Sequence, residues 1–185
     1  MYLELKVCDC IEEVIKIKIT IKLATVDEKE ILVNLMEKYE YESSQYTGAK
    51  INELGIYGCY DWLDDFWQDE ASWSYLIQVD DRLAGFALVG DFPIDGQQTD
   101  FIIDEFFIIY NYRKQGIGKF VVNHLLNKHK GRWGVIYTPK NISATKFWVK
   151  VISEYTNGNY EQIENYAPVS YDDDDTLGTV LLFES

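Results

Sequence analysis

A short segment rich in glycine and basic residues could bind a phosphate group. It runs from Arg113 to Lys119, follows the apolar stretch 101–110 and precedes a pattern typical of an amphipathic helix. Glycine has no side chain, so the backbone at Gly116 and Gly118 can approach a ligand closely. The start of the helix adds unpaired N–H groups and the positive end of the dipole, which attract anions. The segment therefore predicts a pyrophosphate site, and a purely structural turn is the alternative.

Two common phosphate-binding motifs do not fit this segment. The mononucleotide P-loop has a longer glycine spacing and a Ser or Thr after its Lys, whereas Phe120 follows Lys119 here. The dinucleotide fingerprint has a small residue three places after its second glycine, where this chain has Val121. The remaining pattern, Arg-x-x-Gly-x-Gly between a strand and a helix, resembles the coenzyme A pyrophosphate loop of the GNAT superfamily of N-acetyltransferases.

A second segment resembles another signature of the same superfamily. Residues 141–150 follow the apolar run 133–137 and contain an Asn that closes a strand, then a helix with Ala, an aromatic pair and Lys. In the superfamily, this Asn and helix flank the pantetheine arm, so the resemblance implies acetyl-CoA as the acyl donor. It assigns cofactor binding to Phe106, Phe107, Ile108, Arg113, Lys114, Gln115, Gly116, Ile117, Gly118, Lys119, Asn141, Ala144, Phe147 and Trp148.

The strand before the glycine turn contains the candidate catalytic residue. In the superfamily, backbone N–H groups of the splayed fourth strand bind the oxyanion and the pantetheine, which here implicates Phe106, Phe107 and Ile108. Glu105 is the candidate general base, because burial in this apolar strand would raise its pKa toward the working range. A carboxylate paired with a nearby Arg or Lys is the alternative. Strand alternation predicts that Asp104 points to the opposite face.

The position of the expected general acid departs from the superfamily. Many members have a Tyr seven residues after the signature Asn, which protonates the departing sulfur, whereas this chain has Trp148. An indole N–H donates a hydrogen bond but no proton at neutral pH. Either the thiolate, with a pKa near about 8.5, leaves with little help while Trp148 packs the pantetheine channel, or transfer activity is absent. The usual Gly-Phe after the helix Lys is also replaced, by Val151 and Ile152.

The segment 57–70 is the candidate acceptor pocket. Aromatic walls with carboxylates suit a primary ammonium or a polyamine, through cation–π contacts and ion pairing. Packing of a loop on the core, or a homodimer contact, is the alternative. The aromatic residues are Tyr57, Tyr60, Trp62, Phe66 and Trp67, and the acidic residues are Asp61, Asp64, Asp65 and Glu70.

Composition narrows the classes of protein. The 185 residues fit a single domain over 1–185, and a net charge of −14 argues against nucleic acid while suiting a cationic acceptor. No apolar run is long enough to span a membrane, and the N-terminus lacks the features of a signal peptide. The cysteines, Cys8, Cys10 and Cys59, have no metal-ligand spacing and favour a reducing compartment. We therefore expect a cytoplasmic protein without a metal site.

Apolar periodicity predicts the order of the elements. A half-buried strand is expected over 15–23, followed by a helix with a capping box at Thr25 and Glu28 and an apolar stripe at Ile31, Leu32, Leu35, Met36 and Tyr39. Further expectations are a short helix at 51–57, strands at 73–79 and 83–89 joined by a turn at 80–82, a loop at 91–96, a central strand at 101–110, a helix from residue 117 with Gly131 as its C-cap, and strands at 135–137, near Tyr160 and at 177–183.

Three details accompany this order. His124 and His129 are expected to face solvent, and the run 172–175 is expected to be a solvated loop rather than a cation site. The first dozen residues either extend the first strand or cover the sheet edge. The order of elements is that of a GNAT-like fold in the α/β (α+β) class, with a central mixed, mainly antiparallel sheet flanked by helices.

The combined pattern favours an acyl-CoA-dependent N-acyltransferase, of the GNAT N-acetyltransferase type, that moves an acetyl group to a primary amine of a small molecule. A non-catalytic coenzyme A-binding or interaction protein is the alternative from another class. A protein Nα- or lysine-acetyltransferase would differ only in its acceptor. The sequence does not identify the amine.

Overall fold

The computed structural model describes residues 1–8, 11–58, 60–91, 94, 99–172 and 174–185. Cys10, Cys59 and most of the predicted loop 91–96 therefore lie outside the described residues. The elements are β1 (Tyr2–Cys8), β2 (Ile11–Leu23), η1 (Val26–Glu28), α1 (Lys29–Thr47), η2 (Asp61–Asp64), α2 (Asp65–Gln68), β3 (Trp73–Val79), β4 (Arg82–Gly90), β5 (Phe101–Ile108), η3 (Tyr110–Tyr112), α3 (Ile117–Lys128), β6 (Arg132–Tyr137), α4 (Ile142–Thr156), β7 (Tyr160–Ser170) and β8 (Leu177–Glu184).

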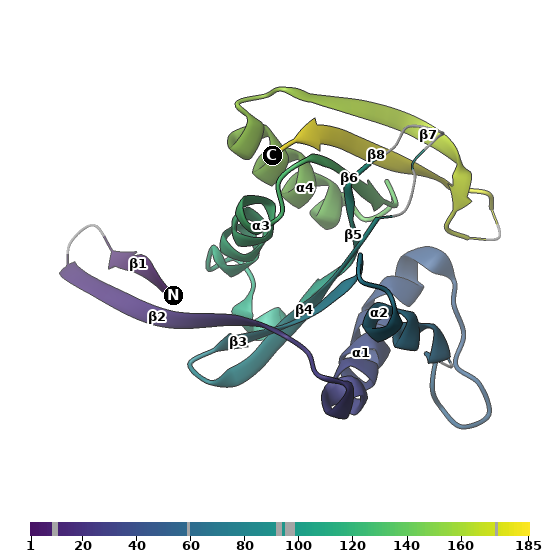
Figure 1. Ribbon diagram of the computed structural model, residues 1–185, viewed down its shortest axis with the longest axis horizontal. Helices are drawn as coiled ribbons and strands as arrows, with labels where there is room; N and C mark the ends of the chain where they lie inside the picture. Colours follow the sequence, from purple (N-terminus) through teal and green to yellow (C-terminus); the bar gives the residue numbers. More distant parts are fainter. Residues whose placement is uncertain (9–10, 59, 92–93, 95–98, 173) are drawn as a thin grey trace.

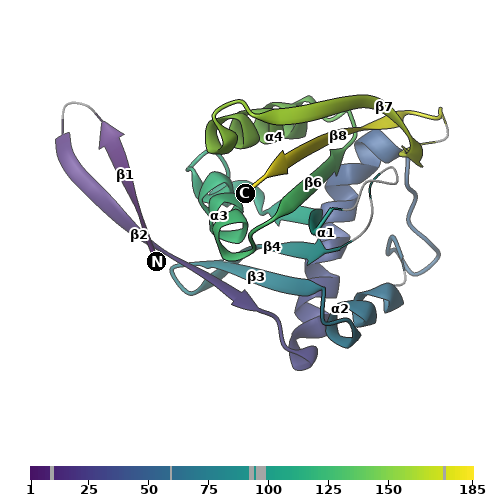
Figure 2. The same ribbon diagram turned by 45° about the horizontal axis from the view of Figure 1, so that its top comes forward.

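The strands form one sheet with helices on both faces, which confirms the predicted fold class (Figure 1). The order is β1-β2-β3-β4-β5-β6-β8-β7, and β5 pairs with β6 in parallel while the other neighbours are antiparallel. Figure 2 shows α3 and α4 on one face and α1 on the other. Alternation divides the core accordingly: Tyr75 and Ile77 pack toward α3 and α4, whereas Leu76 packs toward α1.

The capping box forms as predicted at the start of the first helical segment. The Glu28 carboxylate accepts from the N–H of Thr25 at 3.1 Å, and Thr25 is the N-cap of η1, which leads into α1. Leu32, Leu35 and Met36 from the predicted stripe are buried. They pack α1 against the sheet and thereby hold Tyr39 of the same stripe over β5.

The predicted helix at 51–57 is wrong, because this segment forms turns. The side-chain oxygen of Asn52 accepts from the backbone N–H groups of Leu54 and Ile56, and Gly55 has a φ of +77°. Such side-chain bonds compete with a helical backbone. The helical residues lie further along the chain, in η2 and α2.

The sequence left the role of the first dozen residues open, and β1 among them forms a two-stranded ribbon with the first part of β2. It projects from the body of the molecule (Figure 1). The amino group of Met1 donates to the carbonyl of Ile19 at 3.1 Å, and Leu3 packs against the main core. Leu3 also lies 3.6 Å from the place of a Cβ at Gly116, so β1 begins beside the glycine turn.

Helix α3 ends earlier than predicted, at Lys128, and its C-cap is His129 rather than Gly131. A Cβ at Gly131 would lie 2.4 Å from the carboxylate of Asp100, so glycine is needed there for close packing. His129 is half-buried rather than facing solvent. Its ring lies 4.5 Å from that of Trp73, and its Nε2 lies 2.7 Å from the hydroxyl of Tyr75.

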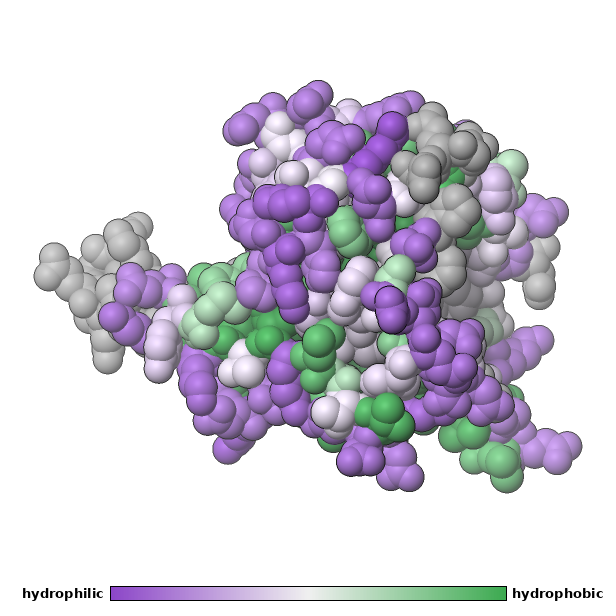
Figure 3. Space-filling view, viewed as in Figure 1, coloured by the Kyte–Doolittle hydropathy of each residue, from purple (hydrophilic) through white to green (hydrophobic). Residues whose placement is uncertain are grey.

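The surface matches the charge of the chain. Figure 3 shows a mostly hydrophilic face, as a net charge of −14 requires. Within the described part of the chain, no helix combines the length and the apolar character needed to span a membrane.

Candidate active site

The sheet opens between β5 and β6. These strands pair only at three positions, from Phe101 with Trp133 to Ile103 with Val135. A bulge follows directly, because Val89 of β4 pairs with Ile103 while Leu88 pairs with Glu105, which leaves Asp104 as the extra residue. The bulge bends β5, and the rest of the strand has no register with β6. An opening results at the middle of the sheet.

Backbone N–H groups of β5 face this opening. The N–H of Ile109 donates to the carbonyl of Ala84 at 2.8 Å, and successive residues of an antiparallel strand alternate in direction. The N–H groups of Phe106 and Ile108 therefore point away from β4, whereas that of Phe107 points toward it. Of the three predicted backbone donors, the pairing leaves Phe106 and Ile108 facing the opening.

The glycine turn has the geometry of an anion site. Gly116 is the N-cap of α3 with a φ of +77°, and Lys114 also has a positive φ of +59°. The first α-helical bond runs from the N–H of Phe120 to the carbonyl of Gly116 at 3.0 Å. The N–H groups of residues 117–119 consequently have no acceptor within the helix. They point out of its N-terminus, where the helix dipole is positive.

The side chains of the turn are partly engaged within the chain. Nη1 of Arg113 lies 2.7 Å from the Glu42 carboxylate of α1, and its guanidinium lies 5.3 Å from the ring centre of Phe107. Nζ of Lys119 pairs with Glu154 of α4 at 2.6 Å. Nε2 of Gln115 donates to the carbonyl of Asn111 at 2.7 Å. Arg113 thus joins the turn to α1, and the backbone carries the anion-binding geometry.

Helix α4 places its aromatic pair against β5. Asn141 caps the helix, since its side-chain oxygen accepts from the N–H of Ala144 at 3.0 Å. The ring of Phe147 stacks on that of Phe106 at 5.8 Å, and Trp148 meets Phe106 edge-on at 5.4 Å. Trp148 is only 6% exposed. The second signature therefore packs beside the opening, next to the splayed part of β5.

A side chain at position 118 would crowd this packing. A Cβ at Gly118 would lie 3.1 Å from the ring of Phe147 and 3.7 Å from that of Phe106. The absence of a side chain at Gly118 therefore lets the start of α3 lie close to the aromatic cluster. The turn and the aromatic pair, far apart in the sequence, form one site.

Glu105 lies on the face of the sheet that α1 covers. Its carboxylate accepts a hydrogen bond from the hydroxyl of Tyr39. Burial raises the pKa of Glu105 to about 8, the charges of Asp104 and Glu40 act in the same direction, and the bond from Tyr39 opposes them. The charges around this carboxyl are therefore negative, and among the described residues no Arg or Lys pairs with it. This environment suits a proton acceptor near neutral pH.

The prediction that Asp104 points to the opposite face is wrong. The bulge interrupts the alternation of β5, so Asp104 lies on the side of α2 and its charge acts on Glu105. Burial raises the pKa of Asp104 as well. Asp104 lines an open pocket of about 640 Å³ together with Trp62, Asp65, Phe66, Gln68, Asp69 and Ser72.

The predicted acceptor segment divides into two groups of residues. The hydroxyl of Tyr60 donates to Glu37 at 2.8 Å, the N–H of Tyr57 donates to the same carboxylate at 3.0 Å, and Nε1 of Trp67 donates to the carbonyl of Ala24 at 2.9 Å. These aromatic residues pack the segment onto the core, which was the alternative to an acceptor pocket. Trp62 and Asp65 instead line the pocket at Asp104.

Two tyrosines near Glu105 were missed as site residues. Tyr39 was assigned only to the apolar stripe of α1, and Tyr171 of the loop between β7 and β8 carried no local signal. Burial is the main cause that raises the pKa of the Tyr171 hydroxyl, and the charges of Glu105 and Asp104 raise it further. Tyr171 lies in a loop far along the chain, so sequence spacing could not reveal that these carboxyls act on it.

Comparisons with known proteins agree with this geometry. A probable acetyltransferase from Staphylococcus epidermidis ATCC 12228 has a similar structure, with a TM-score of 0.63, 14% identity, and coverage of 91% of this chain and 99% of that chain. A GNAT-family acetyltransferase from Streptococcus agalactiae 2603 has a TM-score of 0.61 and 17% identity, and the match covers 90% of this chain and 95% of that chain. The spermidine N-acetyltransferase from Vibrio cholerae, in complex with CoA and spermine, has a TM-score of 0.58 and 11% identity, and the match covers 89% of this chain and 93% of that chain.

No curated protein matches the sequence. The three similar structures show the fold, and the sequence itself carries the assignment to a family. Residues 35–152, more than half of the chain, match the model of the acetyltransferase (GNAT) family. They include both signatures and the bulged strand that precedes them. The chain belongs to the GNAT family of acetyltransferases.

Proposed function

We propose that this chain, as a single domain over residues 1–185, transfers an acetyl group to a primary amine of a small cationic molecule. Membership of the GNAT family makes it an acyl-CoA-dependent N-acetyltransferase with acetyl-CoA as co-substrate. The observation that carries the proposed mechanism is the place of Glu105, whose pKa is raised to about 8 at the bulge where β5 leaves β6.

The binding of acetyl-CoA would use the two signatures together. The N–H groups of residues 117–119 would hold the pyrophosphate at the start of α3, with Lys114 and Lys119 exposed beside it. The arm would pass the opening between β5 and β6, beside the aromatic residues Phe106, Phe147 and Trp148. Acetyl-CoA supplies the activated thioester.

Each step of the transfer then has a residue. Glu105 accepts a proton from the attacking amine, directly or through one water, as the C–N bond forms. The N–H groups of Phe106 and Ile108 face the oxygen that becomes negatively charged. The C–S bond breaks and the sulfur leaves as a thiolate, which needs little acid assistance because a thiol has a pKa near about 8.5. Trp148 therefore contributes packing and no proton.

The acceptor is proposed to carry a second positive charge. The pocket beside Glu105 contains the carboxylates Asp65, Asp69 and Asp104 and the partly exposed indole of Trp62. Such a site attracts an ammonium group through ion pairing and a cation–π contact. A diamine can place its reacting nitrogen at Glu105 and its other nitrogen in this pocket. The negative charge of the whole chain, −14, favours the same class of acceptor.

Loss of thioester absorbance with a panel of acceptors tests this function. We expect 1,4-diaminobutane to give the highest kcat/KM, butylamine a much lower value, and added salt to reduce the difference. A lysine-containing peptide as the best acceptor would support a protein acetyltransferase instead. Binding of acetyl-CoA without turnover of any amine would favour the non-catalytic coenzyme A-binding alternative.

A further inference from the structure

The projecting ribbon of β1 and the first part of β2 leaves one edge of the sheet open. The strand order begins with β1, so β1 has a pairing partner on one side. Because β2 pairs with β3 only from Ile19 to Leu23, the ribbon beyond Ile19 consists of two strands. Figures 1 and 2 show no other described element along the outer side of its projecting part. A two-stranded ribbon is marginally stable in water, and a free edge can pair with another strand.

The pairing of β1 with β2 decides which backbone groups form this free edge. Met1 and Ile19 exchange two hydrogen bonds, of 3.1 and 2.9 Å, so the backbone groups of Met1 point toward β2. The direction of these groups alternates along an antiparallel strand. The N–H and carbonyl groups of Tyr2, Glu4 and Lys6 therefore point away from β2, toward the place where a further strand can pair.

The opposite edge strand, β7, is poorly suited to a further strand. Asn165 has a positive φ of +56°, and the register of β7 with β8 shifts twice. Pro168 has no N–H to donate. Such irregularities protect an edge strand from pairing with another chain. In contrast, β1 pairs in regular register from Tyr2 to Lys6 and contains no proline.

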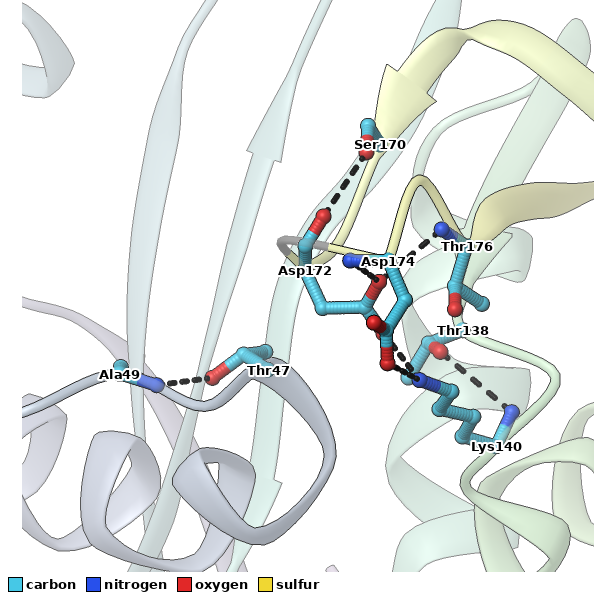
Figure 4. A network of polar contacts seen from close by, with 8 residues as sticks. All are labelled: Thr47, Ala49, Thr138, Lys140, Ser170, Asp172, Asp174 and Thr176. Atoms are coloured by element: carbon cyan, nitrogen blue, oxygen red, sulfur yellow. Dashed lines mark hydrogen bonds and ion pairs between the residues drawn. The ribbon is translucent and has the colours of Figure 1, made fainter.

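An ion pair also fixes the chain beyond β7 (Figure 4). Nζ of Lys140, in the turn before α4, lies 2.5 Å from the Asp172 carboxylate. The same carboxylate accepts from the N–H groups of Asp174 and Thr176, each at 3.0 Å. The expected solvated loop is thus wrong for Asp172, whose side chain is 7% exposed. Of the two edges, β1 is the one that remains open to pairing.

The free edge of β1 is complementary to itself. When two copies pair antiparallel about Leu5, Glu4 of each copy lies opposite Lys6 of the other, so opposite charges meet twice about the two-fold axis. Both residues belong to the free edge, so their backbone groups can exchange hydrogen bonds. A shift by two residues, the smallest that keeps these bonds, sets Glu4 against Glu4 or Lys6 against Lys6. Because like charges directly opposite are destabilising, the charges select the register about Leu5.

The exposed face and the core face of β1 both suit this arrangement. The carboxylate of Glu4 lies 3.4 Å from Nζ of Lys16, and the Glu4 side chain is 62% exposed. Lys6 of a second copy would therefore join an accessible pair of charges. On the other face Leu3 packs against the main core, and the register about Leu5 sets Leu3 opposite Val7 of the second copy. A charged row and an apolar row would each continue from one copy into the other.

We propose that two copies of this chain associate through β1, paired antiparallel about Leu5, in a ribbon with the strand order β2-β1-β1-β2. Backbone hydrogen bonds join the copies, and the pairs of Glu4 with Lys6 fix the register. The contact is separate from the segment 57–70, for which the sequence left a homodimer contact as an alternative. The inference does not rest on the proposed function.

The molar mass in solution provides the first test. Sedimentation equilibrium over about a hundredfold range of protein concentration should show the wild type reaching twice the 21.6 kDa of one chain. Glu4→Lys and Lys6→Glu each set like charges opposite at two symmetric positions, so the dissociation constant of the dimer should rise at least about tenfold. Glu161→Lys is the matched control, because it makes the same change of charge at an exposed residue of β7, the other edge strand. It should change the dissociation constant by less than about twofold.

Two rescue experiments test the register. The double variant Glu4→Lys, Lys6→Glu restores opposite charges across the two-fold axis and should dimerise as the wild type does. An equimolar mixture of the two single variants should form mixed dimers, because one chain then carries lysine at both positions and the other carries glutamate at both. Circular dichroism and the melting temperature of each single variant establish that it is folded before the mixture is made.

The outcomes decide the inference whether or not the chain transfers acetyl groups. A wild type that stays monomeric at the highest concentration overturns it. So does a dimer whose dissociation constant stays within about twofold in both single variants, since another surface then holds the copies together. Folded single variants that do not combine in the mixture overturn it as well. Restored dimers in the double variant and in the mixture support pairing through β1 about Leu5.

Discussion

The hydroxyl of Tyr39 on α1 donates a hydrogen bond to the carboxylate of Glu105 on β5. The ring of Tyr39 meets Phe86 and Phe107 edge-on at 6.1 and 5.9 Å, so packing fixes the position of its hydroxyl. The bond stabilises the ionised form of Glu105 and opposes burial, which raises the pKa of this group to about 8. The first helix thus sets how readily the candidate base accepts a proton.

The first prediction concerns this bond. Tyr39→Phe removes a stabilising contact of the ionised carboxylate, so the pKa of Glu105 should rise further. The acidic limb of the kcat/KM profile, which reports the free enzyme, should move to higher pH, and activity near pH 7 should fall. Tyr41→Phe serves as the control, because Tyr41 is an exposed tyrosine on the same helix. A limb that stays in place would show that the bond does not tune the base.

The second prediction concerns the base itself. Glu105→Gln keeps the shape of the side chain and removes its capacity to accept a proton, so turnover should fall about 10²-fold or more. The acidic limb should disappear with it, while acetyl-CoA affinity should change little. Full activity with an unaltered pH profile would assign proton removal to another group, with Asp104 the nearest carboxyl.

The fold was predictable because its main elements follow from local patterns. The alternation around Ile17 and Ile19 predicted a half-buried strand, and both residues are buried in β2. Thr25 and Glu28 predicted the start of the helical segment, and the two signatures predicted the starts of α3 and α4. Each of these features depends on neighbours within one turn of helix or a few residues of strand.

The errors arise where distant residues decide the conformation. The side of the sheet that Asp104 faces depends on its register with β4, and the bulge that changes this register has no local signal. The end of α3 is set by packing of His129 among aromatic rings from other strands. Tyr171 lies in a distant loop, and no pattern along the chain signals that the charges of Glu105 and Asp104 act on it. The site residues that were missed are thus those contributed by tertiary contacts.

The third prediction concerns the cofactor turn. Acetyl-CoA should raise the melting temperature of the wild type much more than ATP does, because the ligand binds only the folded state. Gly118→Val should abolish this shift, since a side chain there blocks the turn and meets Phe147. Gly58→Val is the control, because a Cβ at Gly58 has no heavy atom within 4 Å. Retained acetyl-CoA affinity in Gly118→Val would place the cofactor elsewhere.

The fourth prediction concerns the departure from the family at Trp148. Trp148→Phe should keep most of the turnover, because a thiolate leaves without a proton donor at this position. Trp148→Ala should leave a cavity beside Phe106 and Phe147, weaken acetyl-CoA binding, and lower the free energy of unfolding by about 3–5 kcal/mol. Turnover and urea unfolding measure the two effects. Equal damage by Phe and Ala would reveal a specific role for the indole N–H.

The last prediction concerns the dependence of stability on pH at His129. Burial, followed by the charges of Lys128 and His124, lowers the pKa of His129 below its usual 6.5. The unfolded chain therefore binds a proton at a higher pH than the folded chain does, so the contribution of His129 to stability is present above about pH 6.5 and is lost as the pH falls through the folded pKa.

His129→Gln keeps a possible partner for the Tyr75 hydroxyl but does not titrate. Urea unfolding at about pH 7.5 and 5.5 should show a smaller loss of stability in His129→Gln than in the wild type. Other groups, including Glu105, titrate in both proteins and cancel in the comparison. An equal loss in the two proteins would mean that the ring among Trp73, Phe101 and Trp133 accepts a proton as readily as it does in water.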